Sequence, residues 1–317
     1  MAKQPIIVVL GPTASGKTAL AIELAKLYNG EVISADSMQI YKGMDILTAK
    51  PKASEMQGIK HHLLDFLEPE TDFSVADYVK LANNAIDDIA GRGKLPVLAG
   101  GTGLYINSLI DNIKFDDTTG DKEFRERLFS IAKEKGNHYL WERLLEVDEA
   151  SALSIHENNV PRVVRALEVF EKTGEKLSEH KKFSRLEESR FLPVMIGLAF
   201  SDRQLLYDRI NKRVDTMIAD GLIDEAEEIY KSKKMNTAHQ AIGYKELIPY
   251  FSGQDSLEEC IEKIKMETRR YAKRQLTWFR RDERIIWIEV DKFKNIEEIS
   301  EKVKKHIAIC KKVWYNY

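Results

Sequence analysis

Cysteine is scarce in this 317-residue sequence, which has only Cys260 and Cys310, in no spacing that suits zinc. This scarcity fits a reducing compartment, with the cytoplasm as the expected location, and argues against a structural metal. Long apolar runs are also lacking, since nowhere do eighteen apolar residues follow one another. The apolar run before Gly11 is too short for a signal peptide. We therefore expect no membrane association.

An excess of charge of either sign is lacking too, because 49 Lys and Arg against 51 Asp and Glu give a formal net charge of -2. Such a balance supplies no general attraction to nucleic acid, so any such binding must come from local clustering. The content of 43% hydrophobic and 32% charged residues suffices for one large domain with an appendage or two.

Apolar, β-branched runs alternate with helical stretches along most of the chain, which predicts a doubly wound α/β fold. The sequence predicts a helix at 17–28 and strands at 5–11, 31–36, 95–103, 191–200 and 284–290, with a weaker strand at 61–67. Between Phe115 and Arg190 the strand signals vanish and helical periodicity remains. We expect a P-loop NTPase-like parallel sheet flanked by helices, with a core of residues 1–115 and 190–317 and a helical insertion domain of residues 116–189.

The stretch GPTASGKT matches G-x-x-x-x-G-K-[ST], a loop that holds a polyphosphate between a strand and a helix. Its residues are Gly11, Pro12, Thr13, Ala14, Ser15, Gly16, Lys17 and Thr18. We expect the backbone N–H groups of residues 14–18 to face phosphate oxygens, with Lys17 as a point charge and Thr18 as a Mg²⁺ ligand. The motif leaves open which polyphosphate is bound.

Two polar residues fall at the predicted carboxyl ends of strands, where ligands bind in such folds. Asp36 could ligate Mg²⁺, act as a general base, or cap a helix that follows it, and local sequence favours capping. Thr102 could present its hydroxyl to the same crevice or could start a helix. A clean Walker B strand and a guanine-recognition signature are lacking, which argues against a motor and a GTPase switch.

Two basic features have two interpretations each. Arg209 and Arg213 lie one helical turn apart, so they could clamp a leaving diphosphate or pair with Asp202, Asp208 or Asp215. Residues 262–284 carry nine Lys or Arg against four acidic residues, with aromatics among them. This segment could bind a phosphate backbone and stack on bases, or could be a solvated face whose aromatics pack on the sheet.

Six blocks follow one another along nearly the whole chain: GPTASGKT, SADSMQIYKGMDILTAKP, GGTGLY, RALEV, AIGYKE and AKRQLTWFRR. Together they resemble the tRNA dimethylallyltransferase family, the tRNA prenyltransferases. The resemblance implies transfer of a dimethylallyl group from dimethylallyl diphosphate to N6 of the adenosine 3′-adjacent to the anticodon. It also implies that diphosphate rather than ATP occupies the loop, that Mg²⁺ is the cofactor, and that the anticodon stem-loop of tRNA is the partner. We expect a monomer.

The resemblance implies roles for individual residues. Asp36 would accept the proton of the attacking amine, Thr102 would hydrogen-bond near the reacting centre, and Arg209 would contact the diphosphate. The residues implied to contact tRNA are Asp36, Ser37, Met38, Gln39, Thr102, Arg125, Pro161, Arg162, Val163, Val164, Arg165, His239, Gln240, Ala241, Ile242, Gly243, Tyr244 and Lys245. Pro161 departs from the Gln common in the family, and the zinc finger of eukaryotic relatives is lacking, which implies a bacterial-type enzyme.

Two other functions stay open on the residues alone. A small-molecule or nucleoside kinase would share the loop, the sheet and a mobile lid, and would bind ATP. A non-catalytic tRNA-binding protein or nucleotide switch would need the basic segment but not the crevice.

Overall fold

The computed structural model describes residues 3–113, 121–179, 188–232 and 237–314. Contacts between residues divide the chain into a core unit, Met1–Ile110 with Ser189–Tyr317, and a helical unit, Asp111–Glu188. The expected domain boundary between residues 115 and 116 lies outside the described residues. The core unit is therefore made from two stretches of chain that are far apart in the sequence.

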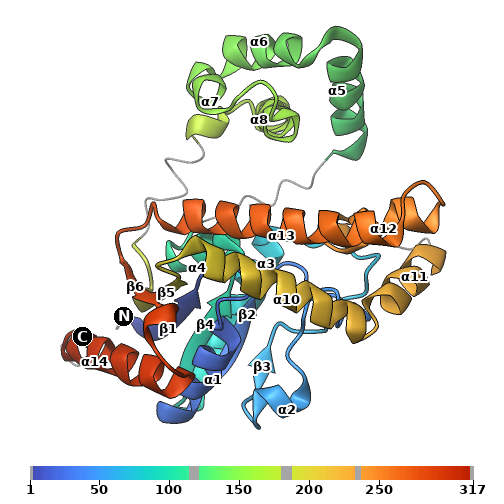
Figure 1. The fold of residues 1–317 in the computed structure, drawn as a ribbon. Helices are drawn as coiled ribbons and strands as arrows, with labels where there is room; N and C mark the ends of the chain where they lie inside the picture. Colours follow the sequence, from blue (N-terminus) through green and yellow to red (C-terminus); the bar gives the residue numbers. More distant parts are fainter. Residues whose placement is uncertain (1–2, 114–120, 180–187, 233–236, 315–317) are drawn as a thin grey trace. The chain divides into compact units, whose positions relative to one another are not determined.

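Six parallel strands form one sheet in the core unit, in the order β3-β2-β4-β1-β5-β6 (Figure 1). Their bounds are β1 Gln4–Leu10, β2 Gly30–Ala35, β3 His61–His62, β4 Leu95–Gly100, β5 Phe191–Ala199 and β6 Ile285–Glu289. The predicted fold class, a parallel sheet flanked by helices, is confirmed. β3 is shorter than the predicted 61–67 because it pairs only with Val32 and Ile33 at the edge of the sheet.

Helices surround this sheet and also make up the helical unit. In the core unit they are α1 Lys17–Leu27, α2 Ala53–Met56, α3 Val75–Gly91, α4 Gly103–Ile110, α10 Arg203–Ala219, α11 Leu222–Ser232, α12 Tyr244–Phe251, α13 Leu257–Phe279 and α14 Ile296–Trp314, with 3-10 turns η1 Thr237–Gln240 and η2 Val290–Lys292. Those of the helical unit whose bounds the structure describes are α5 Lys122–Lys135, α6 Asn137–Val147, α7 Glu149–Ser154 and α8 Val160–Thr173. Among the described residues, no helix has the length and apolar character to cross a membrane.

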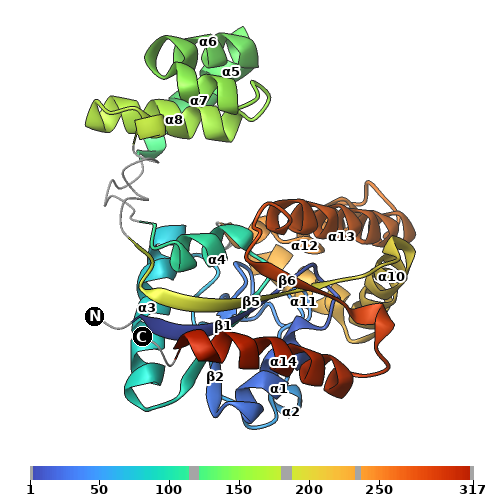
Figure 2. The same ribbon diagram turned by 90° about the vertical axis from the view of Figure 1, so that its left-hand side faces the viewer.

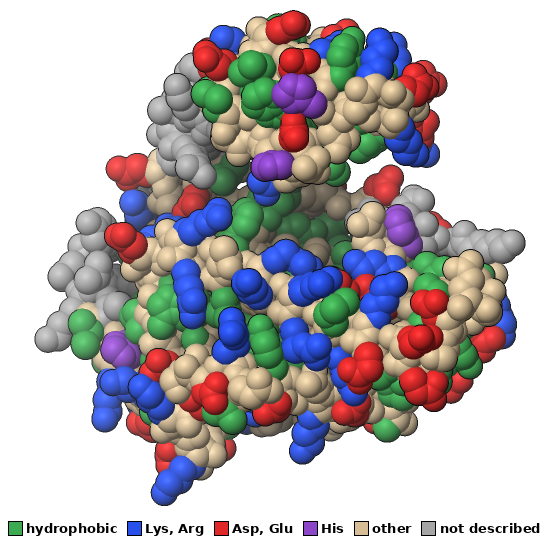
Figure 3. Space-filling view, turned by 45° about the horizontal axis from the view of Figure 1, so that its top comes forward, with side chains coloured by type: hydrophobic (Ala, Val, Ile, Leu, Met, Phe, Trp, Pro, Cys, Tyr) green, Lys and Arg blue, Asp and Glu red, His purple; other side chains and the backbone are tan. Residues whose placement is uncertain are grey.

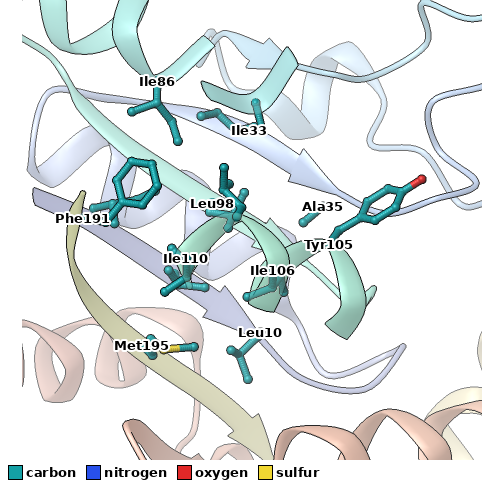
Figure 4. Close-up of a cluster of buried hydrophobic side chains, with 14 of the residues drawn as sticks. Leu10, Ile33, Ala35, Ile86, Leu98, Tyr105, Ile106, Ile110, Phe191 and Met195 are labelled. Carbon is teal, nitrogen blue, oxygen red and sulfur yellow. The ribbon is translucent and has the colours of Figure 1, made fainter. Parts of the chain in front are cut away.

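Both faces of the sheet are covered by helices. Side chains alternate along each strand, so successive residues are buried on opposite faces. Ile6, Val8 and Leu10 of β1 join a core with α3 and α4, part of which is drawn in Figure 4. Ile7 and Val9 join the opposite core with α1 and α14. Figure 2 shows α1 and α14 on the other side of the sheet from α4. This two-sided burial explains why the strands read as continuous apolar runs.

A third cluster of buried residues holds α10 to α13 against the chain that follows β2. Ile40 and Leu47 from that chain pack with Val214 of α10, Leu222 of α11 and Ile264 of α13. Leu206 and Ile210 of α10 also pack with Ala272 of α13 beside Ala14. These contacts fix α10 and α13 next to the loop that follows β1.

The helical unit has its own core and its own buried charge. The Glu168 carboxylate is fully buried and accepts hydrogen bonds from Arg125 Nε at 2.8 Å, Arg165 Nη1 at 2.7 Å and Asp121 N at 2.7 Å. A buried carboxylate is tolerated when its oxygens are satisfied in this way.

Candidate functional site: a phosphate-binding cleft

The loop between β1 and α1 has the geometry of an anion cradle. Gly16, the residue before α1, has a φ of 92°, in the left-handed region that glycine adopts without steric cost. Ala14 has a φ of 62°, which is unusual for a residue with a side chain. Within the described residues, α1 receives no hydrogen bond from a capping side chain. Its first N–H groups and the positive end of its dipole can therefore serve a ligand.

Lys17 is folded back over this loop, with Nζ donating to Pro12 O at 2.7 Å. Burial, and after it the Arg213 guanidinium, lower the pKa of Lys17 to about 8, against the opposite effect of Asp36. A buried cation beside a second cation is stabilised by an anion bound between them. The electrostatics of the site thus favour a phosphate-bearing ligand.

Asp36, Ser37 and Thr102 lie together because β2 and β4, which they follow, are neighbours in the sheet. Ser37 N donates to Thr102 Oγ1 at 3.0 Å, and Asp36 Oδ1 accepts from Met38 N at 2.9 Å. The helix-capping interpretation of Asp36 is wrong, since the next helix, α2, begins only at Ala53. Thr102 starts α4, because its carbonyl accepts from Tyr105 N. Its hydroxyl accepts from Ser37 N, and Thr102 is not among the residues that line the two pockets beside it, so a direct contact of Thr102 with a ligand stays a prediction.

The two arginines of α10 turn toward the loop. Arg209 Nε donates to Ala14 O at 3.0 Å. Arg213 is half-buried, and burial lowers its pKa while Asp36 opposes that effect. Both guanidinium groups line the same cleft as Lys17. A diphosphate in this cleft would have three cations around it.

The carboxylates that could have neutralised these arginines bind other groups. Asp202 accepts from the backbone N of Gln204, and Asp208 accepts from the amide of the same Gln204 side chain. Asp215 lies 2.8 Å from Lys265 Nζ. Of the two interpretations of the Arg209–Arg213 pair, the geometry therefore favours the diphosphate clamp.

Two pockets of the core unit meet at Asp36. The larger, which we call the P-loop cleft, has a volume of about 890 Å³ and is lined by Lys17, Thr18 and Arg209 among others. The smaller, which we call the adjoining pocket, has a volume of about 270 Å³. The residues that line both are Thr13, Asp36, Thr48, Ala49, Arg213, Met217 and Tyr271. A carboxylate at the junction can contact a ligand in either pocket.

The sequence model described as IPP transferase matches residues 39–282, more than half of the chain. The chain belongs to the IPP transferase family. Like the other members of the IPP transferase family, it is therefore a transferase.

Relatives within the IPP transferase family match nearly the whole chain. The tRNA dimethylallyltransferase of Thermoanaerobacter sp. (strain X514) is 52% identical over 306 residues, which are 96% of this chain and 97% of that protein. The solved tRNA isopentenylpyrophosphate transferase of Bacillus halodurans has a TM-score of 0.72 at 43% identity, over 99% of this chain and 100% of that one. A eukaryotic dimethylallyltransferase acting on tRNA has a TM-score of 0.75 at 33% identity, over 87% of this chain and 70% of that one.

The core-unit residues expected to contact tRNA divide between the pockets and the interior. Those that line the adjoining pocket are Asp36, Ser37, Met38, Gln240, Ala241, Ile242 and Lys245. Gln39 lines the P-loop cleft, but its Nε2 already donates to Thr48 O and Ala49 O at 3.1 and 3.2 Å. Gly243 and Tyr244 are buried, whereas His239 is exposed.

The helical-unit residues expected to contact tRNA differ strongly in exposure. Pro161 and Arg162 are exposed. Val163 and Val164 are 0% and 1% exposed and pack in the core of the unit. We correct the expectation for these two valines, because buried side chains cannot reach a partner. Arg125 and Arg165 keep exposed atoms but pair with Glu168.

Two residues that hold the walls of this cleft, Gln275 and Glu225, were not predicted from the sequence. Gln275 Oε1 accepts from Thr13 N at 2.9 Å, across 262 positions of sequence. The signal available was the helical phase of α13, since Tyr271 and Gln275 lie one turn apart, on a face different from that of the exposed cations Arg270 and Lys273. Nothing in the sequence pointed to Glu225.

Glu225 of α11 holds the chain between β2 and α2 through three successive backbone N–H groups. Its carboxylate accepts from Asp45 N at 2.9 Å and from Ile46 N and Leu47 N at 2.8 Å each. Thr48, the next residue, lines both pockets. Glu225 therefore anchors the wall at the junction of the pockets to the helix that follows α10.

We expect Glu225→Ala to weaken ligand binding in both pockets, measured as higher KM values, and to lower the melting temperature. Hydrogen bonds to a charged group contribute about 1.5–3 kcal/mol each, and this change removes three at once. Thermal unfolding and steady-state kinetics measure the two effects. Glu228 is an exposed glutamate on the same helix. The Glu228→Ala variant is the matched control and should behave as wild type. A Glu225→Ala protein with unchanged KM values would contradict the anchoring role.

Proposed function

We propose that this chain transfers the dimethylallyl group of dimethylallyl diphosphate to N6 of the adenosine 3′-adjacent to the anticodon of tRNA. The observation that carries the proposal is the position of Asp36 at the junction of the P-loop cleft and the adjoining pocket. From there the Asp36 carboxylate can reach both a prenyl donor bound in the P-loop cleft and an adenine bound in the adjoining pocket. The names of the relatives, tRNA dimethylallyltransferases, support this assignment.

The donor would bind with its diphosphate in the P-loop cleft. Lys17, Arg209 and Arg213 would neutralise the charge that grows on the diphosphate as the allylic C–O bond breaks. The residues present fit Mg²⁺, which prefers hard oxygen ligands, few of them from protein, together with phosphates. The exposed Thr18 hydroxyl lines the cleft and would hold the ion. Bound Mg²⁺ would supply further neutralisation of the leaving diphosphate.

The acceptor adenine would enter the adjoining pocket after leaving the base stack of the anticodon loop. Its exocyclic amine is a weak nucleophile, because its lone pair is delocalised into the ring. Asp36 would accept the amine proton while the new C–N bond forms. Thr102 and Ser37, which hydrogen-bond to each other at 3.0 Å, would orient the base. The alignment of amine and allylic carbon is itself a large part of the rate enhancement.

A cationic surface on α13 would bind the tRNA backbone. Figure 3 shows Lys and Arg side chains gathered on the face of the core unit where α13 and α10 lie. The exposed cations of α13 and the turn after it are Lys263, Arg270, Lys273, Arg274, Arg280, Arg281 and Arg284. Two aromatics of the segment pack inward, since Phe279 is 1% exposed and Trp278 packs against the same core. The third, Tyr271, lines both pockets. Phe279 and Trp278 thus follow the second interpretation of this segment, aromatics packed on the sheet, while the outward row of cations is compatible with both.

We expect tRNA affinity to fall steeply with salt, with a log–log slope of about -0.7 to -0.9 per phosphate contacted. Lys273→Glu should weaken binding and make the slope shallower by about one. Fluorescence anisotropy with a labelled anticodon stem-loop at several salt concentrations measures both. Lys305→Glu on α14, also exposed, is the charge-matched control and should leave the slope intact. A flat salt dependence would mean that the α13 cations are only solvated.

One experiment tests the function itself. Unmodified tRNA, Mg²⁺ and labelled dimethylallyl diphosphate are incubated with the protein, and the tRNA is digested to nucleosides. We expect label on the adenosine next to the anticodon. Consumption of ATP without label in tRNA would favour a kinase instead. Binding of tRNA with neither activity would favour a non-catalytic tRNA-binding protein.

A further inference from the structure

Gln275 joins two loops of the site from the inner face of α13. Its side chain is 5% exposed, and its two ends bind two main-chain groups. Oε1 accepts from Thr13 N of the P-loop at 2.9 Å, and Nε2 donates to Gly101 O of the β4–α4 turn at 3.0 Å. Neither Thr13 N nor Gly101 O is among the N–H groups of residues 14–18 that are expected to face phosphate oxygens. Gln275 therefore connects the loops and leaves their ligand-facing groups available.

The two loops that Gln275 joins carry opposite halves of the proposed reaction. The P-loop holds the diphosphate, and so fixes the allylic carbon. The β4–α4 turn carries Thr102, which accepts from Ser37 N and donates its own N–H to Ala35 O at 3.1 Å. Ala35 and Ser37 flank Asp36, so the turn fixes the general base.

The packing leaves little freedom around this connection. A Cβ atom added to Gly101 would lie 2.1 Å from Gln275 Nε2, and one added to Gly103 would lie 2.3 Å from Trp278 Cδ1. The turn thus approaches α13 at two neighbouring points, of which only the first involves Gln275. Substitution of Gly101 would therefore disturb the Gln275 amide, whereas substitution of Gly103 would disturb the contact of the same turn with Trp278.

We propose that Gln275 is a positioning residue that sets the distance between the donor's diphosphate loop and the Asp36–Thr102 side of the site. This inference rests on the proposed function, because it assigns Gln275 a part in that reaction. A displacement of reacting groups by about 1 Å can cost about 10²-fold in rate. Loss of the amide should therefore appear in kcat rather than in tRNA binding.

The test compares Gln275→Leu, Gly101→Ala and Gly103→Ala. Gln275→Leu should lower kcat by about 10²-fold and leave the KM for tRNA unchanged. Gly101→Ala displaces the amide without removing it, and should lower kcat in the same way. Gly103→Ala presses on Trp278 and should lower the melting temperature but keep kcat near that of wild type. The Gln275→Leu/Gly101→Ala double variant should be no slower than the slower single variant, because both changes break one connection.

A second measurement does not depend on turnover. Calorimetry with inorganic diphosphate and Mg²⁺ should give Gln275→Leu an affinity weaker by about threefold to tenfold, because the empty P-loop no longer has the hydrogen bond that holds Thr13 N in place. An active wild type together with a Gln275→Leu protein of wild-type kcat and diphosphate affinity would overturn this inference and leave the proposed function standing. Equal kcat losses in Gly103→Ala and Gln275→Leu would reduce Gln275 to a packing role. A wild type that does not prenylate tRNA would overturn both proposals.

Discussion

Asp36→Asn is expected to slow prenyl transfer by about 10²–10⁴-fold, the usual contribution of a general base. The side-chain amide keeps the size of the carboxylate and an oxygen for Met38 N, which Asp36 Oδ1 binds at 2.9 Å. The chain after β2 should therefore keep its path. What the variant would lose is the role proposed for Asp36, accepting a proton from the adenine amine. Single-turnover assays with saturating tRNA and donor measure this chemical step.

The control for Asp36→Asn must remove the same charge from the same cleft. Asp220 also lines the P-loop cleft, but it does not line the adjoining pocket and its carboxylate lies 3.2 Å from Lys52 Nζ. Asp220→Asn should stay close to the wild-type rate. Equal losses of tRNA affinity and of turnover in Asp36→Asn would assign Asp36 to recognition. Equal slowing by both variants would point to a general charge effect.

The sequence predicts those parts of the site that depend on contiguous residues or on the order of the strands. GPTASGKT sets its own geometry, because a strand, a glycine turn and a helix follow within one short segment. Asp36 and Thr102 could be brought together because neighbouring parallel strands end at the same edge of the sheet. Arg209 and Arg213 could be placed on one face because they lie one helical turn apart.

Contacts across long stretches of sequence could not be predicted. Gln275 meets Thr13 and Glu225 meets Asp45 only because the sheet and α10 to α13 have already folded. The same reason explains the error at Asp36: the residues after it look like the start of a helix, but Glu225 holds their neighbours in turns.

A motif block does not show which of its side chains face the solvent. PRVVR resembles a tRNA-contacting block as a whole, yet helical phase exposes Pro161 and Arg162 and buries Val163 and Val164. A resemblance gives the segment, and the amphipathic pattern of α8 decides which of its residues can reach a partner.

Lys17→Ala should lower kcat/KM for dimethylallyl diphosphate by about 10²–10³-fold, the range found when one group that stabilises developing negative charge is removed. The loss has two causes. The donor's diphosphate loses a cation in the ground state, and the leaving diphosphate loses it as the C–O bond breaks. Affinity for tRNA, measured without donor, should change little, because Lys17 lines the P-loop cleft and not the adjoining pocket.

The pH dependence of kcat/KM in the wild-type enzyme tests the role of Lys17 without a substitution. Because burial and Arg213 lower the pKa of Lys17 to about 8, the empty site holds a charged lysine below that pH and a neutral one above it. Since kcat/KM reports groups in the free enzyme, it should fall as pH rises through about 8. Bound diphosphate favours the charged form, so kcat should persist to higher pH. The Lys17→Arg variant should be slower, but its kcat/KM should not fall in this pH range, because arginine does not titrate there. The same fall of kcat/KM in Lys17→Arg would mean that another group titrates.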